Sequence, residues 1–132
     1  MATEKSPFAK FLKRYPKGTV LFHEGDEGED MYIIQSGKVA IKKRVPHGET
    51  TLAILEKGDF FGEMAMLERL PRSASAEVVE AGDLIVISGD MFGDMIKANP
   101  EIAVRMLRKQ SIRLRDTNKQ LEEALRGQPT SV

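Results

Sequence analysis

Short apolar segments separated by turn residues are the feature that most constrains the fold of this chain. The gaps between the segments carry glycine, proline or aspartate, which favour turns. We expect strands at Thr19–Phe22, Met31–Gln35, Lys38–Lys42, Thr50–Leu55, Glu77–Glu80 and Leu84–Ser88. The second and third strands form a hairpin in this interpretation, as do the last two. Repeated short strands of this kind predict a sandwich or barrel.

The C-terminal third of the chain changes from strands to helices. A short helix is expected over residues 90–98, with Asp90 as its cap. A second helix begins at Asn99-Pro100, because asparagine suits the N-cap and proline the first helical position. It contains no glycine or further proline before Gly127, so we predict one helix to Arg126, roughly 40 Å long.

One stretch between the strands, Gly58–Ala76, combines glycines, a carboxylate, an arginine and small residues. Gly62 permits close backbone approach, and the free N–H groups of the helical turn after it attract anions. Arg72 follows as a planar cation beside the Ser73 hydroxyl. A ligand with a phosphate and a hydroxyl suits this set, with Glu63 accepting from the hydroxyl. The alternative is a surface ion pair between Glu63 and Arg72, which contributes little.

Two motifs in this stretch resemble the phosphate-binding cassette of the cyclic nucleotide-binding domain family: Phe61-Gly62-Glu63-Met64-Ala65 and Pro71-Arg72-Ser73-Ala74-Ser75. That family includes the catabolite activator protein and the regulatory subunits of protein kinase A. The resemblance implies an α+β, mainly β fold: an eight-stranded antiparallel jelly roll with short flanking helices and a long C-terminal helix. It also implies that the ligand is bound by Gly62, Glu63, Met64, Ala65, Arg72, Ser73 and Ala74.

We interpret residues 1–132 as a single domain. The β-roll spans about 8–89 and the C-terminal helices 90–126, while 1–7 and 127–132 are flexible tails. Phe8–Tyr15 has the apolar spacing of a short helix, although the family has a first strand there. The acidic turn at Glu24–Asp30 resembles a turn of the family. It lacks the spaced ligands of a calcium loop, so we interpret it as a solvated hairpin.

The long helix carries two apolar seams at heptad spacing. One seam holds Leu107, Leu114 and Leu121, and the other holds Val104, Ser111, Asn118 and Leu125. This pattern predicts a homodimeric coiled coil, in which a buried asparagine fixes the register. The alternative is an amphipathic helix that covers its own domain. In the family's activator proteins, polar residues of this helix contact the nucleotide base. The resemblance places Thr117 and Asn118 there, with Arg113 near the base.

Composition excludes several classes of function. Lys+Arg and Asp+Glu both number 20, so no net charge attracts nucleic acid or a membrane. There are no cysteines, and His23 and His47 make no metal-binding spacing. No apolar run is long enough to span a membrane, so we expect a cytoplasmic protein. No catalytic set is visible, and we expect no enzyme. The chain stops at Val132 without a helix-turn-helix, so we expect a stand-alone domain that does not bind DNA, unless it is a piece of a longer protein.

The function expected from the resemblance is that of a cyclic nucleotide sensor. cAMP is favoured over cGMP as the ligand, although Ser73 stands where the family's cGMP-selective members carry threonine. No other cofactor is expected. The pocket would be walled by Ile54, Leu55, Phe61, Met64 and Val78, and occupancy would pass through the long helix to an unknown protein effector. Two alternatives remain: a protein-interaction module that binds no nucleotide, and a cyclic dinucleotide receptor.

Overall fold

The computed structural model describes residues 11–126 and confirms the expected fold. The expected tails at 1–7 and 127–132, and Phe8, lie outside the described residues. The chain divides into two compact units, Met1–Phe92 and Gly93–Val132. The strands are β1 (Leu12–Tyr15), β2 (Val20–Phe22), β3 (Met31–Ile34), β4 (Lys38–Val45), β5 (Gly48–Leu55), β6 (Phe60–Phe61), β7 (Ser75–Glu80) and β8 (Gly82–Ile87). The helices are α1 (Glu63–Glu68), α2 (Gly89–Ala98) and α3 (Pro100–Arg126).

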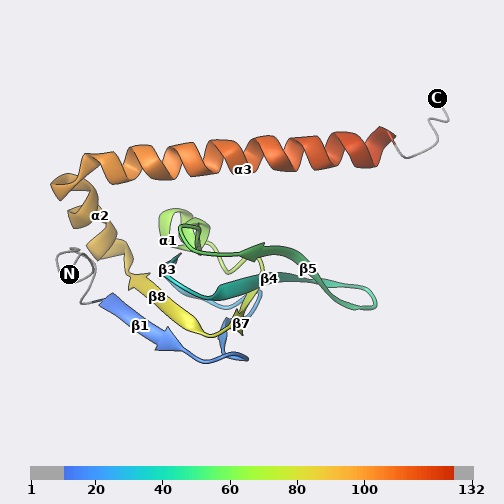
Figure 1. Cartoon of the computed structure of the whole chain (residues 1–132), viewed down its shortest axis with the longest axis horizontal. Coiled ribbons are helices and arrows are strands. Elements are labelled where there is room, and N and C mark those ends of the chain that lie inside the picture. Colours follow the sequence, from blue (N-terminus) through green and yellow to red (C-terminus); the bar gives the residue numbers. More distant parts are fainter. Residues whose placement is uncertain (1–10, 127–132) are drawn as a thin grey trace. The chain divides into compact units, whose positions relative to one another are not determined.

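The strands form two antiparallel sheets of four strands each. Their orders are β1-β8-β3-β6 and β2-β7-β4-β5, and the strands can be followed in Figure 1. Both sheets contribute equally to one apolar core, made of Tyr32, Ile34, Phe61 and Leu84 from the first sheet and Val39, Leu55, Ala76 and Val78 from the second. This is the jelly roll that the resemblance implied. The stretch before Pro16, for which the sequence left a short helix or a strand open, contains a strand, because β1 pairs with β8.

Two of the expected hairpins are wrong, because β3 and β4 lie in different sheets, as do β7 and β8. The β3–β4 connection and the β7–β8 connection instead each run from one sheet to the other, and the two connections pack against each other. A Cβ on Gly37 would lie 2.6 Å from the Glu80 carbonyl oxygen, and Gly82 lies directly against Ser36. The Ser36 hydroxyl accepts from the Asp83 N–H at 2.9 Å. Alternation within a strand shows which face is buried, but not which sheet the strand joins.

The strands β4 and β5 form a hairpin, and each strand is longer than expected. The register of the hairpin runs from Val39 opposite Leu55 to Val45 opposite Gly48, with an irregularity after Ile41. The acidic stretch at 24–30 is also not a hairpin, because it connects β2 of one sheet to β3 of the other.

The helices begin close to the expected positions. At α2 the cap is Ser88 rather than Asp90, because the Ser88 hydroxyl accepts from the Met91 N–H at 3.4 Å. Asp90 lies within the first turn. Pro100 is the first residue of α3, which is a single helix of 27 residues (Figure 1).

Among the helices within residues 11–126, none combines the length and the apolar character needed to cross a membrane.

Candidate ligand-binding site

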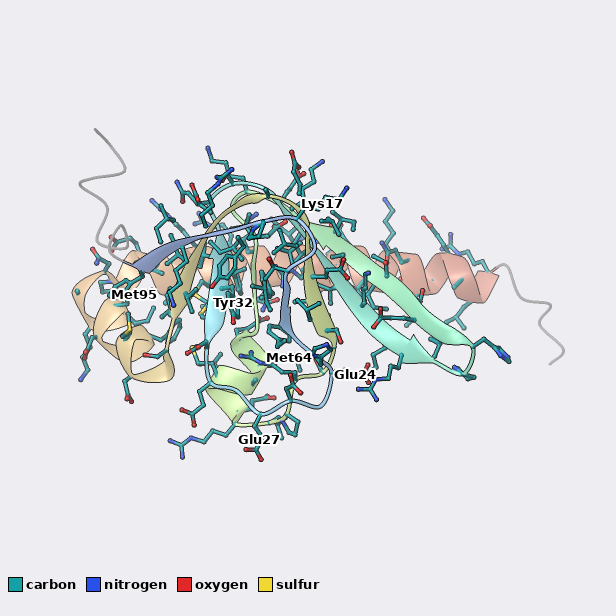
Figure 2. All side chains as sticks on the ribbon, turned by 90° about the horizontal axis from the view of Figure 1, so that it is seen from below. Lys17, Glu24, Glu27, Tyr32, Met64 and Met95 are labelled. Atoms are coloured by element: carbon teal, nitrogen blue, oxygen red, sulfur yellow. The ribbon has the colours of Figure 1, made fainter. Side chains whose placement is uncertain are left out.

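Arg72 is the central residue of the candidate site, and the backbone around it is held on both sides. It lies on the segment that joins α1 to β7. Its N–H donates to the Asp26 carbonyl oxygen at 2.8 Å, and its carbonyl oxygen accepts from the Gly25 N–H at 2.8 Å. The connection between β2 and β3 therefore fixes the Arg72 backbone. Figure 2 shows Glu24 and Glu27 on this connection and Tyr32 on β3.

The Arg72 side chain lies over the ring of Phe22, which belongs to a cluster of three aromatic rings. Its guanidinium carbon is 4.2 Å from the centroid of the Phe22 ring, within cation–π range. Phe22 is 5.9 Å from Tyr32 and 6.1 Å from Phe61, centroid to centroid. Tyr32 and Phe61 stack at 5.0 Å. Burial raises the pKa of the Tyr32 hydroxyl, and the nearby Arg72 charge partly offsets that rise. The three packed rings thus form a fixed apolar surface on one side of the guanidinium.

Two glycines, which have no side chain, leave room for the Arg72 guanidinium. A Cβ on Gly28 would lie 2.7 Å from Nη2 of Arg72, and a Cβ on Gly62 would lie 2.9 Å from Nη1. Gly62 also has a φ of +83°, which favours glycine. In the acidic connection, Gly25 has a positive φ of +89°, whereas at Gly28 it is the contact with Arg72 that requires glycine.

The hydrogen bonding of Arg72 leaves part of its donor capacity unused. Nη1 donates to the Gly62 carbonyl oxygen at 3.2 Å. Nε is buried and has no partner within the part of the chain that the structure describes. Arg72 is only 5% exposed, so the surface ion pair considered as an alternative does not describe it. A buried cation with a free donor is costly to fold unless an acceptor joins it. The arrangement suits an anion.

The other cassette residues lie before and after Arg72 in the sequence, and they differ in solvent exposure. Gly62 precedes α1 and Glu63 is its first residue. Ala65 and Ala74 are buried, while Met64 and Ser73 are exposed. Because α1 has only six residues, its dipole adds little, and Arg72 must supply most of the attraction for an anion. Among the expected site residues, the structure places Gly62 and Arg72 in direct contact.

The five residues expected to wall the pocket divide into two groups. Leu55, Phe61 and Val78 belong to the buried core between the sheets. Ile54 and Met64 are each 52% exposed.

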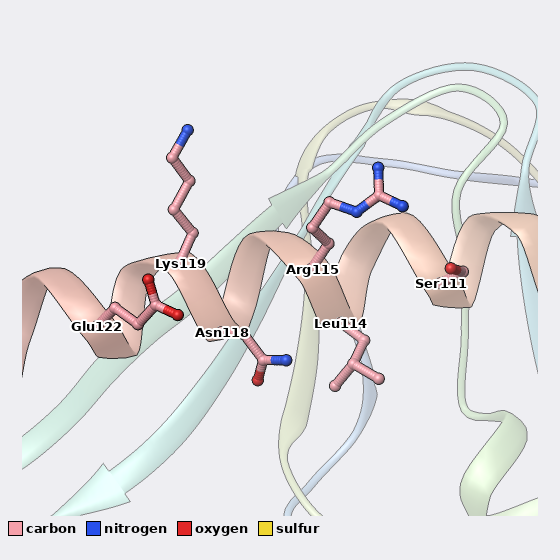
Figure 3. A pocket seen from close by; sticks show the side chains of 6 residues that line it. All are labelled: Ser111, Leu114, Arg115, Asn118, Lys119 and Glu122. Carbon is pink, nitrogen blue, oxygen red and sulfur yellow. The ribbon is translucent and has the colours of Figure 1, made fainter.

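The expected base-contacting residues all lie on α3, in the second unit. Figure 3 shows a hollow on this helix with Leu114 and Asn118 on the same side. The hollow is lined by Ser111, Leu114, Arg115, Asn118, Lys119 and Glu122. Within the described chain, the seam leucines are exposed, up to 70% for Leu107. Base contacts by Thr117, Asn118 and Arg113 stay predictions.

Sequence reasoning missed the residues that support the cassette from other elements. Gly28 and Phe22 contact Arg72, and Lys43 of β4 donates to the Ser73 carbonyl oxygen. Nothing local to these positions signals the role, because it depends on strands distant in sequence. Among the described residues, no cluster of three His, Asp or Glu side chains is placed to hold a metal ion.

Known proteins resemble this chain in sequence and in fold. The family model of the cyclic nucleotide-binding domain matches residues 12–99. The chain is 37% identical over 112 residues to the CRP-like cAMP-activated global transcriptional regulator of Mycobacterium tuberculosis, covering 84% of this chain and 50% of that protein. The crystal structure of the Thermus thermophilus catabolite activator protein has a TM-score of 0.74 and 34% identity, covering 86% of this chain and 54% of that one.

A second solved structure, the regulatory domain of Toxoplasma gondii PKA crystallised with cAMP, has a TM-score of 0.60 and 37% identity. The similarity covers 63% of this chain and 32% of that one. The chain spans about half the length of the curated relatives it matches. The matched residues include the whole jelly roll and both cassette motifs. This chain therefore belongs to the cyclic nucleotide-binding domain family.

Proposed function

We propose that the domain binds a cyclic mononucleotide, cAMP in preference to cGMP, with its phosphate on Arg72. The observation that carries this proposal is the buried Arg72 side chain, whose Nε has no partner among the described residues. A planar guanidinium pairs with two oxygens of a phosphate more favourably than an ammonium does. The aromatic ring beneath the guanidinium and the two glycines beside it hold the guanidinium in one orientation.

Neighbouring cassette residues complete the proposed site. The Ser73 hydroxyl and the Ala74 N–H donate to the phosphate beside Arg72. Glu63 accepts from the ribose 2′-hydroxyl, which uses the acceptor capacity of a carboxylate. The backbone at Gly62, with Met64 and Ala65 after it, approaches the ribose phosphate. The choice of cAMP is supported by two relatives, since one is described as cAMP-activated and the other was crystallised with cAMP.

The proposed output runs through α3. Exposed leucines at heptad spacing favour a parallel homodimer along this helix. Thr117 and Asn118, with Arg113 nearby, then contact the base, so that the ligand stabilises one arrangement of the helix. The shift is limited to the ligand's difference in affinity for the two arrangements. Hydrogen exchange over residues 107–125 that is unchanged by saturating cAMP would refute this relay.

A regulatory rather than an enzymatic role fits the curated relatives, which are transcriptional regulators. We propose that a further protein or domain receives the signal, and the cytoplasm is the compartment we expect. No cofactor other than the nucleotide itself enters the proposal.

Calorimetric titration tests the ligand assignment. The unsubstituted protein is titrated with cAMP, cGMP and cyclic di-GMP. Arg72→Lys keeps the charge but loses the planar pair of donors, so cAMP affinity should fall about 10- to 100-fold. Arg69→Asn is the matched control, because Arg69 is exposed and its φ of 55° suits asparagine.

Three results would contradict the proposal. Unchanged cAMP affinity in a folded Arg72→Lys variant would exclude Arg72 as the phosphate ligand. Binding of cyclic di-GMP alone would establish the dinucleotide alternative. A folded protein that binds none of the three nucleotides would favour the interaction module.

A further inference from the structure

We propose that Lys43 is a positioning residue for the phosphate site, acting through the peptide group that joins Ser73 to Ala74. The inference rests on the proposed function. Lys43 lies on β4, and its Nζ donates to the Ser73 carbonyl oxygen at 2.8 Å. It does not belong to the cassette motif, and it reaches the cassette from a different strand.

The geometry of the peptide bond connects this contact to the ligand. In a trans peptide the carbonyl of one residue and the N–H of the next point in opposite directions. A hydrogen bond that fixes the Ser73 carbonyl therefore also fixes the Ala74 N–H on the other side of the peptide plane. The Lys43 ammonium also polarises the peptide, which makes the N–H a stronger donor. That N–H is one of the proposed phosphate donors.

Glu24 holds the lysine in place. Its Oε2 is 3.2 Å from Nζ of Lys43, and its Oε1 accepts from the Arg44 N–H at 2.9 Å. The Glu24 carbonyl oxygen accepts from Nη2 of Arg44 at 3.1 Å, and its N–H donates to the Ser75 hydroxyl at 2.8 Å. Glu24 thus joins β4 to the beginning of β7, where the cassette ends. Lys43 is 45% exposed in its side chain, but these contacts restrict its position.

The neighbouring pair, Lys42 and Glu77, provides a matched comparison. Lys42 also lies on β4, and its Nζ is 2.9 Å from Oε1 of Glu77. This pair joins the same two strands, β4 and β7, through a charge-assisted hydrogen bond. The Lys42 ammonium donates to a carboxylate, whereas the Lys43 ammonium also donates to a cassette carbonyl. The two lysines therefore differ in the contact with the Ser73 carbonyl, on which the proposed role of Lys43 depends.

The test compares Lys43→Met, Lys43→Arg and Lys42→Met in the full chain. Methionine keeps the apolar stem and removes the charge and the donors. We expect Lys43→Met to weaken cAMP binding about five- to tenfold, and Lys42→Met to change it less than about twofold. Lys43→Arg retains a donor and should recover most of the affinity. Urea denaturation of each variant measures the loss of stability separately.

A second measurement needs no ligand. The amide resonance of Ala74 in the free protein should shift, and its hydrogen should exchange faster, in Lys43→Met but not in Lys42→Met. Equal effects of the two methionine variants on affinity and on the Ala74 amide would overturn the inference, because loss of a positive charge alone would then explain them. Full affinity in Lys43→Met would overturn it as well.

The failure of the inference is distinguishable from that of the proposed function. If the unsubstituted protein binds no nucleotide, the proposed function fails and the inference about ligand positioning fails with it. If the unsubstituted protein binds cAMP, Arg72→Lys weakens binding as expected and Lys43→Met leaves it intact, the inference about Lys43 alone is wrong.

Discussion

Arg72 and Gly28 touch although they belong to different connections of the jelly roll. A Cβ at Gly28 would lie 2.7 Å from Nη2, 3.0 Å from Nε and 3.1 Å from Cζ of the arginine. The connection between β2 and β3 is thus one wall of the guanidinium site. Its backbone also bonds both sides of the Arg72 residue, through Gly25 and Asp26.

Gly28→Ala should displace the guanidinium and weaken cAMP binding by more than about tenfold, because the added methyl group would lie only 2.7 Å from Nη2. Gly25→Ala is the control in the same connection. Its Cβ meets nothing within 4 Å, but its φ is +89°, so it should cost roughly 1 kcal/mol of stability and little affinity. Calorimetry and urea denaturation separate the two effects. Equal affinities of the two variants would show that the contact does not shape the site.

Acid should weaken the link between β4 and the cassette. The Arg44 N–H and the Lys43 ammonium hold the pKa of the Glu24 carboxyl below its ordinary value of 4.5. A lowered pKa in the folded state means that the ionised carboxylate stabilises the fold above pH 4.5 and that this contribution is lost as the pH falls through the folded-state value. Glu24→Gln should lower stability at pH 7 and make the curve of stability against pH flatter below about 4.5. An unchanged curve, measured by urea denaturation, would contradict this account.

The core between the sheets should dominate the stability of the first unit. Ile34 is 1% exposed, and Ile34→Ala should cost about 2–5 kcal/mol through lost burial and the cavity left behind. Leu52 on β5 is 59% exposed, and Leu52→Ala should change stability by less than about 1 kcal/mol. Urea denaturation of the two variants checks this difference. Similar losses would mean that Leu52 is covered in solution.

The seam on α3 should control the oligomeric state. Leu114→Glu introduces a charge at the centre of the leucine seam, so it should convert a dimer to a monomer in analytical ultracentrifugation. Asp116→Lys, also exposed but outside both seams, is the matched control and should leave the dimer intact. A monomeric unsubstituted protein would refute the coiled coil, and a dimer that persists in Leu114→Glu would place the contact elsewhere.

The cassette was predictable because its two halves are close in sequence and each half uses particular residue types. Gly62 has the positive φ, and Arg72 returns to bond its carbonyl, ten residues later. The strand segments and the start of α3 at Pro100 were also predictable, since periodicity and helix-start chemistry act locally.

The assignment of strands to sheets was not predictable from alternation. The stretches around Gly37 and Gly82 have the composition of hairpin turns, yet each carries the chain from one sheet to the other. Their glycines serve the packing of one crossover against the other. The roles of Gly28 and Lys43 were hidden for a related reason, because each contacts a residue that only the complete topology brings near.

The contacts of Arg72 with Gly25, Asp26 and Gly28 have a consequence for the order of events during folding. The two halves of the candidate anion site leave the ribosome separately, and the second half leads directly into β7, which must pair with both β2 and β4. Contacts between segments so distant in sequence form late, because the chain entropy of the intervening loop must be lost first. A nascent or truncated chain that ends just before β7 therefore contains both glycines and Arg72, but it lacks the strand that pairs with β2 and β4. Under the proposed function, nucleotide binding therefore reports completion of the jelly roll, and a nucleotide present during synthesis stabilises only finished molecules.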